Sequence, residues 1–511
     1  MLSSTESLAQ KFVNKWFWLY IFTFLIGPLW YFIKVIISRD LAIEEVGMLY
    51  GVISFVTLLS MYNDLWCTES LSYFLPRHIV KHEYGKAKYL IHFVLKMQIL
   101  TSLLIYGSLF LWAWWLSTHY FKSDVTEILK IAGLFFIGIN ILHICTVFFM
   151  AVQDTKLQKS AELIRYIGTA IWSSLLFFGD FGNLERYMMA WIGWLIVSII
   201  FALILFARKY YIPNFLSIKK DIDLKLRKEF LVYAFGTFLT ANIWALLSQV
   251  DMQLVIYLLG PRDSGLYSTY LSLIGIPFIL LTPIIGFLFP VISELAGRNE
   301  EHKIQAIISR FWTYFWIIGI WCGIFLFQYG ETLSVLFFWE KFHPAGTILM
   351  FSAPFIMLNF LIQISFQVLA GIWKVRKRAE ILVVVLIINI ILNLLLIPML
   401  WVNGSALAVS LSWIPLYFMS LRATGLQLPI FGEKSWYKNL ATWLWAFYIT
   451  HILWQKLWGN SVFLEIFLAI LIYLAIFSMT NRKLMKEAFD TIKDVRKGKN
   501  PQQIVDTSLP I

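Results

Sequence analysis

The chain has 511 residues, of which 59% are hydrophobic, 18% aromatic and 14% charged, and its net charge is +12. A single water-soluble core could not enclose this much apolar sequence, so the composition excludes an ordinary soluble globule and indicates a protein whose solvent is lipid. The positive charge does not indicate a nucleic-acid partner, because it is spread over short loops that anionic lipids attract. The three cysteines lie in apolar stretches, which predicts small buried side chains and neither disulfides nor a metal site.

Apolar stretches long enough to cross a bilayer recur about fourteen times, since a spanning helix needs roughly 20 such residues. In chain order the predicted spans are 16–37, 46–75, 89–116, 128–152, 160–181, 187–207, 230–258, 264–292, 307–328, 345–371, 380–401, 404–421, 438–456 and 461–480. The pattern predicts an all-α polytopic membrane protein.

The positions of the lysines and arginines predict how the spans are oriented in the membrane. Of the 42 in the chain, 32 fall in alternate connections and at the two ends, only six fall in the opposite connections, and four lie inside spans. Short cytoplasmic loops retain positive charge and exported loops do not. The distribution therefore predicts a multi-pass protein of the cytoplasmic (inner) membrane with both termini in the cytoplasm.

The longest basic connection, 208–229, suggests how the chain is divided. We expect an N-terminal lobe of six spans over 1–207, this connection as a cytoplasmic amphipathic linker, and a second six-span lobe over 230–421. A merely solvated loop explains 208–229 equally well. The remaining segments are a helix pair over 422–480 and a basic cytoplasmic tail over 481–511.

The two lobes share a weak internal repeat. Gly47 and Tyr50 follow a charged loop and open a long span that ends in proline before a basic loop. Gly265 and Tyr267 occupy the same places in the second lobe. Because both units begin the second helix of their lobe, the repeat is parallel. Parallel repeats predict two pseudo-symmetric lobes with a substrate path between them.

These helix starts, the pair Gln249-x-Asp251, the span that ends at Pro290 and the basic loop 371–378 resemble features of a known family. The chain is similar to the Wzx-type polysaccharide-lipid flippases of the MOP superfamily, which also contains the lipid II flippase and the MATE exporters. The resemblance implies a MATE-like fold with an additional C-terminal helix pair. It implies a monomeric transporter, not an enzyme, for which lipid-linked oligosaccharide, membrane lipids and a polysaccharide polymerase are partners.

The activity that the resemblance implies is alternating access for cell-surface polysaccharide biosynthesis. An oligosaccharide on a polyprenyl phosphate or pyrophosphate would move from the inner to the outer leaflet. The sequence contains no phosphate-binding loop for ATP and no cofactor motif, so H+ or Na+ coupling is expected to drive the movement.

Cations inside the spans are candidates for binding the phosphorylated headgroup. We predict that Lys34, Lys96 and Arg165 lie inside spans and supply the counter-charge for a phosphorylated headgroup. A charge inside a span costs about 2.5–3.5 kcal/mol on insertion scales. Snorkelling of these long side chains to the interface is the competing explanation. Arg165 also follows Glu162 at ion-pair spacing.

Carboxylates inside the spans are candidates for coupling or for lining the cavity. In a continuous helix, Asp64 and Glu69 would point roughly 140° apart and could not share one tight site. Asp64 either faces the translocation path or pairs within the bundle, and Glu69 is expected to pair with Lys96. Asp251, with Gln249, is either a proton-coupling group or half of a structural pair.

His143 is isolated in the sequence, with no second metal ligand nearby, which favours a helix–helix hydrogen bond over a metal site.

Two other functions compete with the flippase. A cation-coupled MATE-type multidrug exporter would need an anionic central cavity instead of a cationic one. A membrane polysaccharide polymerase or glycosyltransferase would need a large exported loop with catalytic groups, whereas the predicted exported loops are short.

Overall fold

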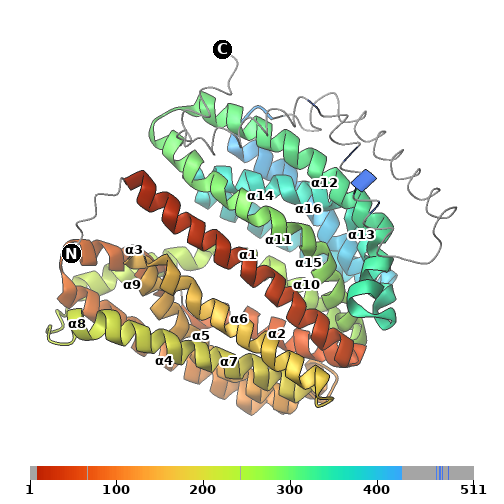
Figure 1. The fold of residues 1–511 in the computed structure, drawn as a ribbon, viewed down its shortest axis with the longest axis horizontal. Helices are drawn as coiled ribbons and strands as arrows, with labels where there is room; N and C mark the ends of the chain where they lie inside the picture. Colours follow the sequence, from red (N-terminus) through yellow and green to blue (C-terminus); the bar gives the residue numbers. More distant parts are fainter. Residues whose placement is uncertain are drawn as a thin grey trace. The chain divides into compact units, whose positions relative to one another are not determined.

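The computed structural model describes residues 8–65, 67–152, 154–241 and 243–428, with five isolated positions beyond them. All regular elements of this part are helices (Figure 1). In chain order the α-helices are α1 Leu8–Asp40, α2 Ile43–Asn63, α3 Cys67–Val80, α4 Tyr84–Trp115, α5 Thr126–Ala151, α6 Thr155–Phe178, α7 Leu184–Phe206, α8 Ile212–Phe215, α9 Leu224–Ala241, α10 Ile243–Leu259, α11 Pro261–Gly297, α12 Glu301–Phe338, α13 His343–Ser352, α14 Ile356–Gly371, α15 Val375–Leu400 and α16 Val402–Thr424.

Eight helical segments of the described part are long and apolar enough to cross a membrane, or nine if the bent helix α11 counts as one span. The prediction of a helical multi-pass protein is therefore confirmed. The predicted spans 438–456 and 461–480, and the tail 481–511, lie outside the continuously described residues. The three cysteines are free and buried, as predicted.

The prediction of one continuous helix over 46–75 is wrong. The helical conformation ends after Asn63, Leu65 takes a left-handed φ of 46°, and α3 begins at Cys67. The Asp64 carboxylate accepts a hydrogen bond from the Thr68 backbone N–H at 3.2 Å, so a side chain satisfies a donor that the break leaves free. Irregular backbone at membrane depth is tolerated where protein or a polar cavity surrounds it.

The predicted span 230–258 covers most of α9 and all but the end of α10, with residue 242 between them outside the described part. The predicted span 264–292 falls in a bent helix. Helix α11 bends by 56° between Pro261–Ile279 and Ile284–Gly297. The bend coincides with Pro283, which has no backbone N–H to donate to the preceding turn.

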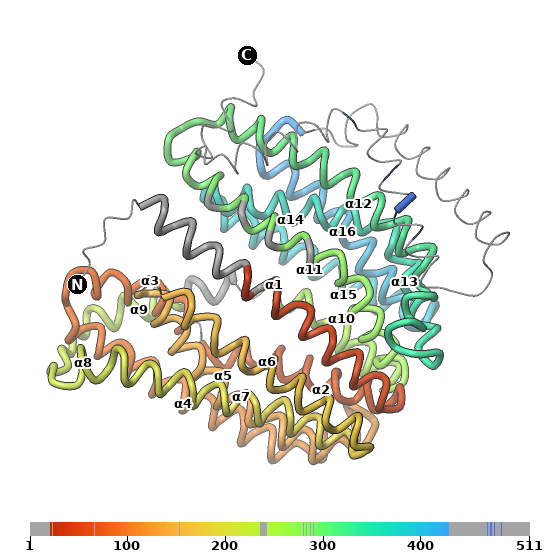
Figure 2. Tube along the Cα trace, viewed as in Figure 1, coloured from red at the N-terminus to blue at the C-terminus, as the bar shows by residue number. Residues whose placement is uncertain are grey.

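The chain falls into two compact units. The first contains 1–284, 334–348 and 379–412, and the second contains the remaining stretches. In the first unit, α5 packs on α4 and α7, and α6 packs on α1 and α7 (Figure 2). The division into two six-helix lobes stays a prediction.

A buried lysine fastens the connection after α7 to helix α4. The Lys88 ammonium, 8% exposed, donates to the carbonyl oxygens of Phe215 at 2.6 Å, Leu216 at 3.2 Å and Ile218 at 2.8 Å. These groups lie at the C-terminal end of α8, where carbonyls have no intrahelical partner. The first part of the predicted linker is therefore a docked segment and not a solvated loop.

Asp154 fixes the same connection from its other end. Its carboxylate accepts hydrogen bonds from Lys209 Nζ at 2.6 Å and Tyr210 Oη at 2.8 Å. Burial alone would raise the pKa of Asp154, but the hydrogen bonds from these two residues outweigh it and hold the pKa below its ordinary value.

We expect Lys88→Met to destabilise this segment, because the Leu216 and Ile218 carbonyls lose the ammonium donor and Phe215 keeps only the Ile218 backbone N–H at 3.2 Å. Each unsatisfied buried acceptor costs about 1–3 kcal/mol, so the melting temperature in detergent should fall and proteolysis should begin near 219–223. Lys86→Met is the matched control, since Lys86 forms only partly exposed ion pairs at 3.8 and 3.9 Å, and such pairs are worth about 0–1 kcal/mol. Equal melting of the two variants would contradict the docking role.

Candidate functional site

Two glycines allow α2 and α11 to approach closely, along a seam at the end of these helices that the sequence predicts to be exported. A methyl group on Gly47 would lie 1.8 Å from the carbonyl oxygen of Pro261, and one on Gly265 would lie 2.1 Å from that of Ile43. These are the equivalent glycines of the predicted repeat, and each approaches the start of the other's helix. A local two-fold axis between the repeats would require each glycine to contact the helix that contains the other.

Polar side chains continue the seam toward the membrane centre, between α2 and α10. The Ser54 hydroxyl donates to Gln249 Oε1 at 2.7 Å, and Gln253 Nε2 donates to Ser54 Oγ at 2.9 Å. Tyr120 Oη donates to Gln253 Oε1 at 3.0 Å. Gln249, predicted from sequence as a cavity residue, thus belongs to a helix–helix contact.

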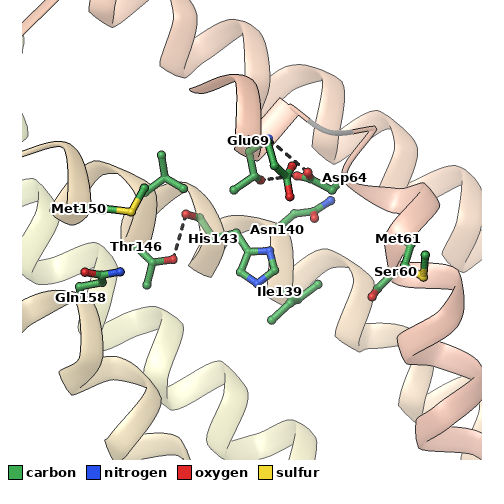
Figure 3. Close-up of a pocket in the computed structure, with 12 residues that line it drawn as sticks. Ser60, Met61, Asp64, Glu69, Ile139, Asn140, His143, Thr146, Met150 and Gln158 are labelled. Atoms are coloured by element: carbon green, nitrogen blue, oxygen red, sulfur yellow. Dashed lines mark hydrogen bonds between the residues drawn. The ribbon is translucent and has the colours of Figure 1, made fainter. Parts of the chain in front are cut away.

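A pocket of about 400 Å³ lies in the other half of the same unit. The basic connections at that end of α3 and α5 belong to the predicted cytoplasmic side. The lining side chains come from α2, α3, α5, α6 and the break after α2: Ser60, Met61, Asp64, Thr68, Glu69, Ile139, Asn140, His143, Thr146, Val147, Met150 and Gln158. Figure 3 shows Asp64 and Glu69 together on one wall, with Asn140, His143 and Thr146 along α5. The pocket therefore contains two carboxylates and an imidazole.

The helix break brings Asp64 and Glu69 to one site. The predicted separation of roughly 140° assumed a continuous helix, and the turn at Leu65 removes that geometry. Asp64 accepts hydrogen bonds from Thr68 Oγ1 and Gln98 Nε2. In the described part of the chain, only neutral groups donate to Asp64.

Sequence reasoning missed the participation of His143, which lies far from Asp64 along the chain. A usable signal existed in the polar residues Asn140, His143 and Thr146, which recur every three positions in an otherwise apolar helix. This spacing places them near one face of α5. The described residues hold no group of three or more His, Cys, Asp or Glu side chains arranged to bind a metal.

Lys34 is buried between α1, α2 and α11 with 3% of its surface exposed. Its ammonium donates to the Ser268 carbonyl oxygen at 2.5 Å and lies 4.3 Å from the ring centre of Tyr50 and 5.5 Å from that of Trp30. These neutral groups and aromatic faces explain how a cation is retained inside the span. Its role in binding a headgroup stays a prediction.

The other two predicted cations lie elsewhere. Lys96 is on an exposed face of α4, and its expected ion pair with Glu69 is not formed among the described residues. Arg165 donates to Tyr166 Oη at 3.2 Å, and its expected partner Glu162 pairs with Lys159 at 2.6 Å. Lys34, Lys96 and Arg165 therefore share no common partner in the described structure.

Asp251 sits in a buried polar network that joins α10, α15 and α16. The carboxylate, in a residue 6% exposed, accepts a hydrogen bond from Asn393 Nδ2 at 2.7 Å. Asn393 also donates to the Asn389 carbonyl at 2.9 Å and accepts from Ser405 Oγ at 2.8 Å. The sequence suggested Asp251, but its partner Asn393 lies far along the chain and was missed, as were Asn389 and Ser405, which contact Asn393.

Solved structures with this architecture define the fold. The lipid II flippase MurJ in an inward closed conformation covers 91% of this chain and 99% of its own, with a TM-score of 0.72 and 16% identity. An inward-facing multidrug resistance MATE family transporter of the MOP superfamily covers 78% and 94%, with a TM-score of 0.65 and 10% identity. The predicted MATE-like fold is confirmed.

Relatives in sequence point to the same group. An uncharacterized membrane protein of Methanocaldococcus jannaschii is 21% identical over 92% of this chain and 95% of its own length. A probable lipid II flippase MurJ of Helicobacter pylori is 24% identical over 78% and 81%, respectively. Residues 12–296 match the polysaccharide biosynthesis protein family, so the chain belongs to that family. It is a flippase-like membrane transporter of the MOP superfamily.

Proposed function

We propose that this protein is a flippase for an oligosaccharide linked to a polyprenyl phosphate or pyrophosphate. It moves the headgroup from the inner to the outer leaflet by alternating access, for cell-surface polysaccharide biosynthesis. Family membership and a probable lipid II flippase among the relatives support this substrate class.

One observation supports alternating access: the first unit is tightly packed at one end of its helices and contains a pocket toward the other end. The exported half is closed by the glycines Gly47 and Gly265 and by the polar contact of Ser54 with Gln249. The cytoplasmic half holds a polar pocket at a broken helix. Broken helices beside cavities near mid-membrane are typical of binding sites in secondary transporters.

Ion coupling is assigned to two carboxylate sites. Asp251 accepts from the Asn393 amide, which itself accepts from the Ser405 hydroxyl, so this carboxylate lies in a polar network where it could take up H+ or a hard cation such as Na+. Asp64 and Glu69 offer a second, more accessible site in the pocket. A carboxylate that changes partners as the cavity opens can link ion binding to the conformational change.

The decisive experiment measures translocation of a fluorescent polyprenyl-pyrophosphate oligosaccharide in reconstituted vesicles. Asp64→Asn should lower the rate at least about tenfold, because charge-assisted hydrogen bonds are worth about 1.5–3 kcal/mol each. Asp124→Asn, at an exposed loop position, is the matched control. Lys96→Ala tests the predicted headgroup contact in parallel.

Two results would contradict the proposal. Absence of transport by the unmodified protein for every lipid-linked sugar would remove the flippase function. Unchanged transport by Asp64→Asn would remove the pocket from the mechanism.

A MATE-type drug exporter is the second candidate, and the acidic lining of the pocket favours it. Carboxylates with neutral partners can bind organic cations electrostatically. Export of a cationic dye by the same vesicles, without movement of lipid-linked sugar, would identify this function instead.

A further inference from the structure

One face of helix α9 forms a groove of about 550 Å³ at the lysine-rich end of the first unit. The side chains that line it recur at intervals of one, three or four positions and therefore occupy one helical face: Leu224, Arg227, Lys228, Leu231, Val232 and Phe235. The stripe is about 16 Å long at 1.5 Å per residue. Two cations lie near one end of this stripe and apolar side chains extend from them.

The opposite face of α9 is packed and cannot be the binding face. Phe230 is fully buried and contacts the rings of Phe74 on α3 and Phe93 on α4. Tyr233 stacks on Tyr73 with ring centres 4.5 Å apart. The helix is thus held in place by one face and presents the other.

The groove face stays open in the described structure. Leu224 and Val232 are each 65% exposed, and Leu231 is 40% exposed. Arg227 and Lys228 are exposed as well, and neither side chain forms an ion pair or hydrogen bond with another described residue. Exposed cations beside exposed apolar surface match an anionic amphiphile whose head lies at the same interface.

We propose that this groove holds the phosphate and first isoprenoid units of the polyprenyl carrier, an assignment that rests on the proposed function. The phosphate lies against Arg227 and Lys228. The hydrocarbon follows Leu231, Val232 and Phe235 toward the membrane centre. The groove holds the carrier on α9 in the inner leaflet before the phosphate and its sugar are translocated.

Charge and shape favour the carrier over an ordinary phospholipid. The free polyprenyl monophosphate carries about 1.5–2 negative charges near pH 7 and a sugar-linked pyrophosphate carries about two, whereas a phosphodiester headgroup such as that of phosphatidylglycerol carries one. Two adjacent cations therefore complement the carrier phosphate better. A stripe on a single helix also matches one hydrocarbon chain more closely than two acyl chains.

The test measures binding of radiolabelled polyprenyl monophosphate to the full-length protein in phosphatidylcholine nanodiscs. The double variant Arg227→Gln/Lys228→Gln should bind at least about tenfold more weakly, because it loses two charge-assisted contacts. Lys225→Gln, an exposed cation of the same turn outside the groove, should bind like the unmodified protein. A photoreactive side chain at position 232 should crosslink to the carrier.

Three results would overturn the assignment. Equal weakening by Lys225→Gln would show bulk attraction without a site. Equal competition by phosphatidylglycerol would show a general lipid surface, and absence of crosslinking from position 232 would place the carrier elsewhere. Binding does not require translocation, so retained binding without transport would count against the proposed function alone. The single variants Arg227→Gln and Lys228→Gln provide the comparison if the double variant accumulates poorly.

Discussion

Replacing Gly47 by alanine should reduce transport at least about tenfold and lower the melting temperature. The new methyl group would lie 1.8 Å from the Pro261 carbonyl oxygen and 2.6 Å from Ser264 Oγ. The nearest atom belongs to the backbone, so rotation of a side chain cannot relieve the overlap. Overpacking of a tight contact costs about 1–3 kcal/mol, which disfavours the closed exported half and changes rates by about tenfold or more.

The reciprocal variant Gly265→Ala should behave in the same way, since its methyl group would lie 2.1 Å from the Ile43 carbonyl oxygen. The double variant should cost less than the sum of the two, because both changes open one seam. Vesicle transport and melting in detergent measure both effects.

The control for these variants is Gly193→Ala in α7. No atom lies within 4 Å of its added methyl group, and alanine favours a helix over glycine by roughly 0.5–1 kcal/mol. This variant should therefore transport normally and melt slightly higher. If Gly47→Ala folds less well but its folded fraction transports at the normal rate, the seam is structural and does not gate the path.

Replacing Asp251 by asparagine should abolish the response of transport to an imposed ion gradient while the protein stays folded. The amide oxygen can still accept from Asn393, which now donates to Asp251 at 2.7 Å, but the charge is gone. Moving one charge across 100 mV is worth about 2.3 kcal/mol, or roughly 50-fold in an equilibrium distribution. We expect the increase in transport rate that the gradient produces in the unmodified protein to disappear. The free energy of unfolding should stay the same or increase, because a buried charge is removed.

Vesicles with a pH gradient, a sodium gradient or neither separate the coupling ions. Asp124→Asn removes a carboxylate from an exposed loop and should respond to gradients normally. Ser405→Ala, which removes the hydroxyl that donates to Asn393 at 2.8 Å, should weaken the response less than Asp251→Asn does. A full gradient response in Asp251→Asn would show that this network is only structural.

Hydropathy averaged over a window explains why the breaks were not predicted. The stretch 46–75 is apolar enough for one span, and the turn at Leu65 depends on hydrogen bonds that Asp64 makes with Thr68 and Gln98. Gln98 comes from another helix, so no local pattern contains the reason for the turn. The same limit applies to Asp251, whose partner Asn393 lies 142 positions away.

Ion pairs predicted from spacing depend on rotamers and on competing partners. Glu162 lies three positions from both Lys159 and Arg165, and it pairs with Lys159 at 2.6 Å while Arg165 contacts Tyr166. Spacing on a helix permits either pair, and the side chains of neighbouring helices determine which one forms.

The sequence by itself determined that this is a helical multi-pass membrane protein of the flippase-like type, and it marked Gly47 and Gly265 as equivalent. Lipid offers no hydrogen bonds to a backbone, so apolar stretches of sufficient length must become helices, and that constraint is local. Only the tertiary structure decided where the helices break and which polar side chains meet. Asp64 and His143 line one pocket because helix packing brings distant residues together. Asp251 accepts from Asn393 because a buried polar group must find a partner wherever the fold supplies one.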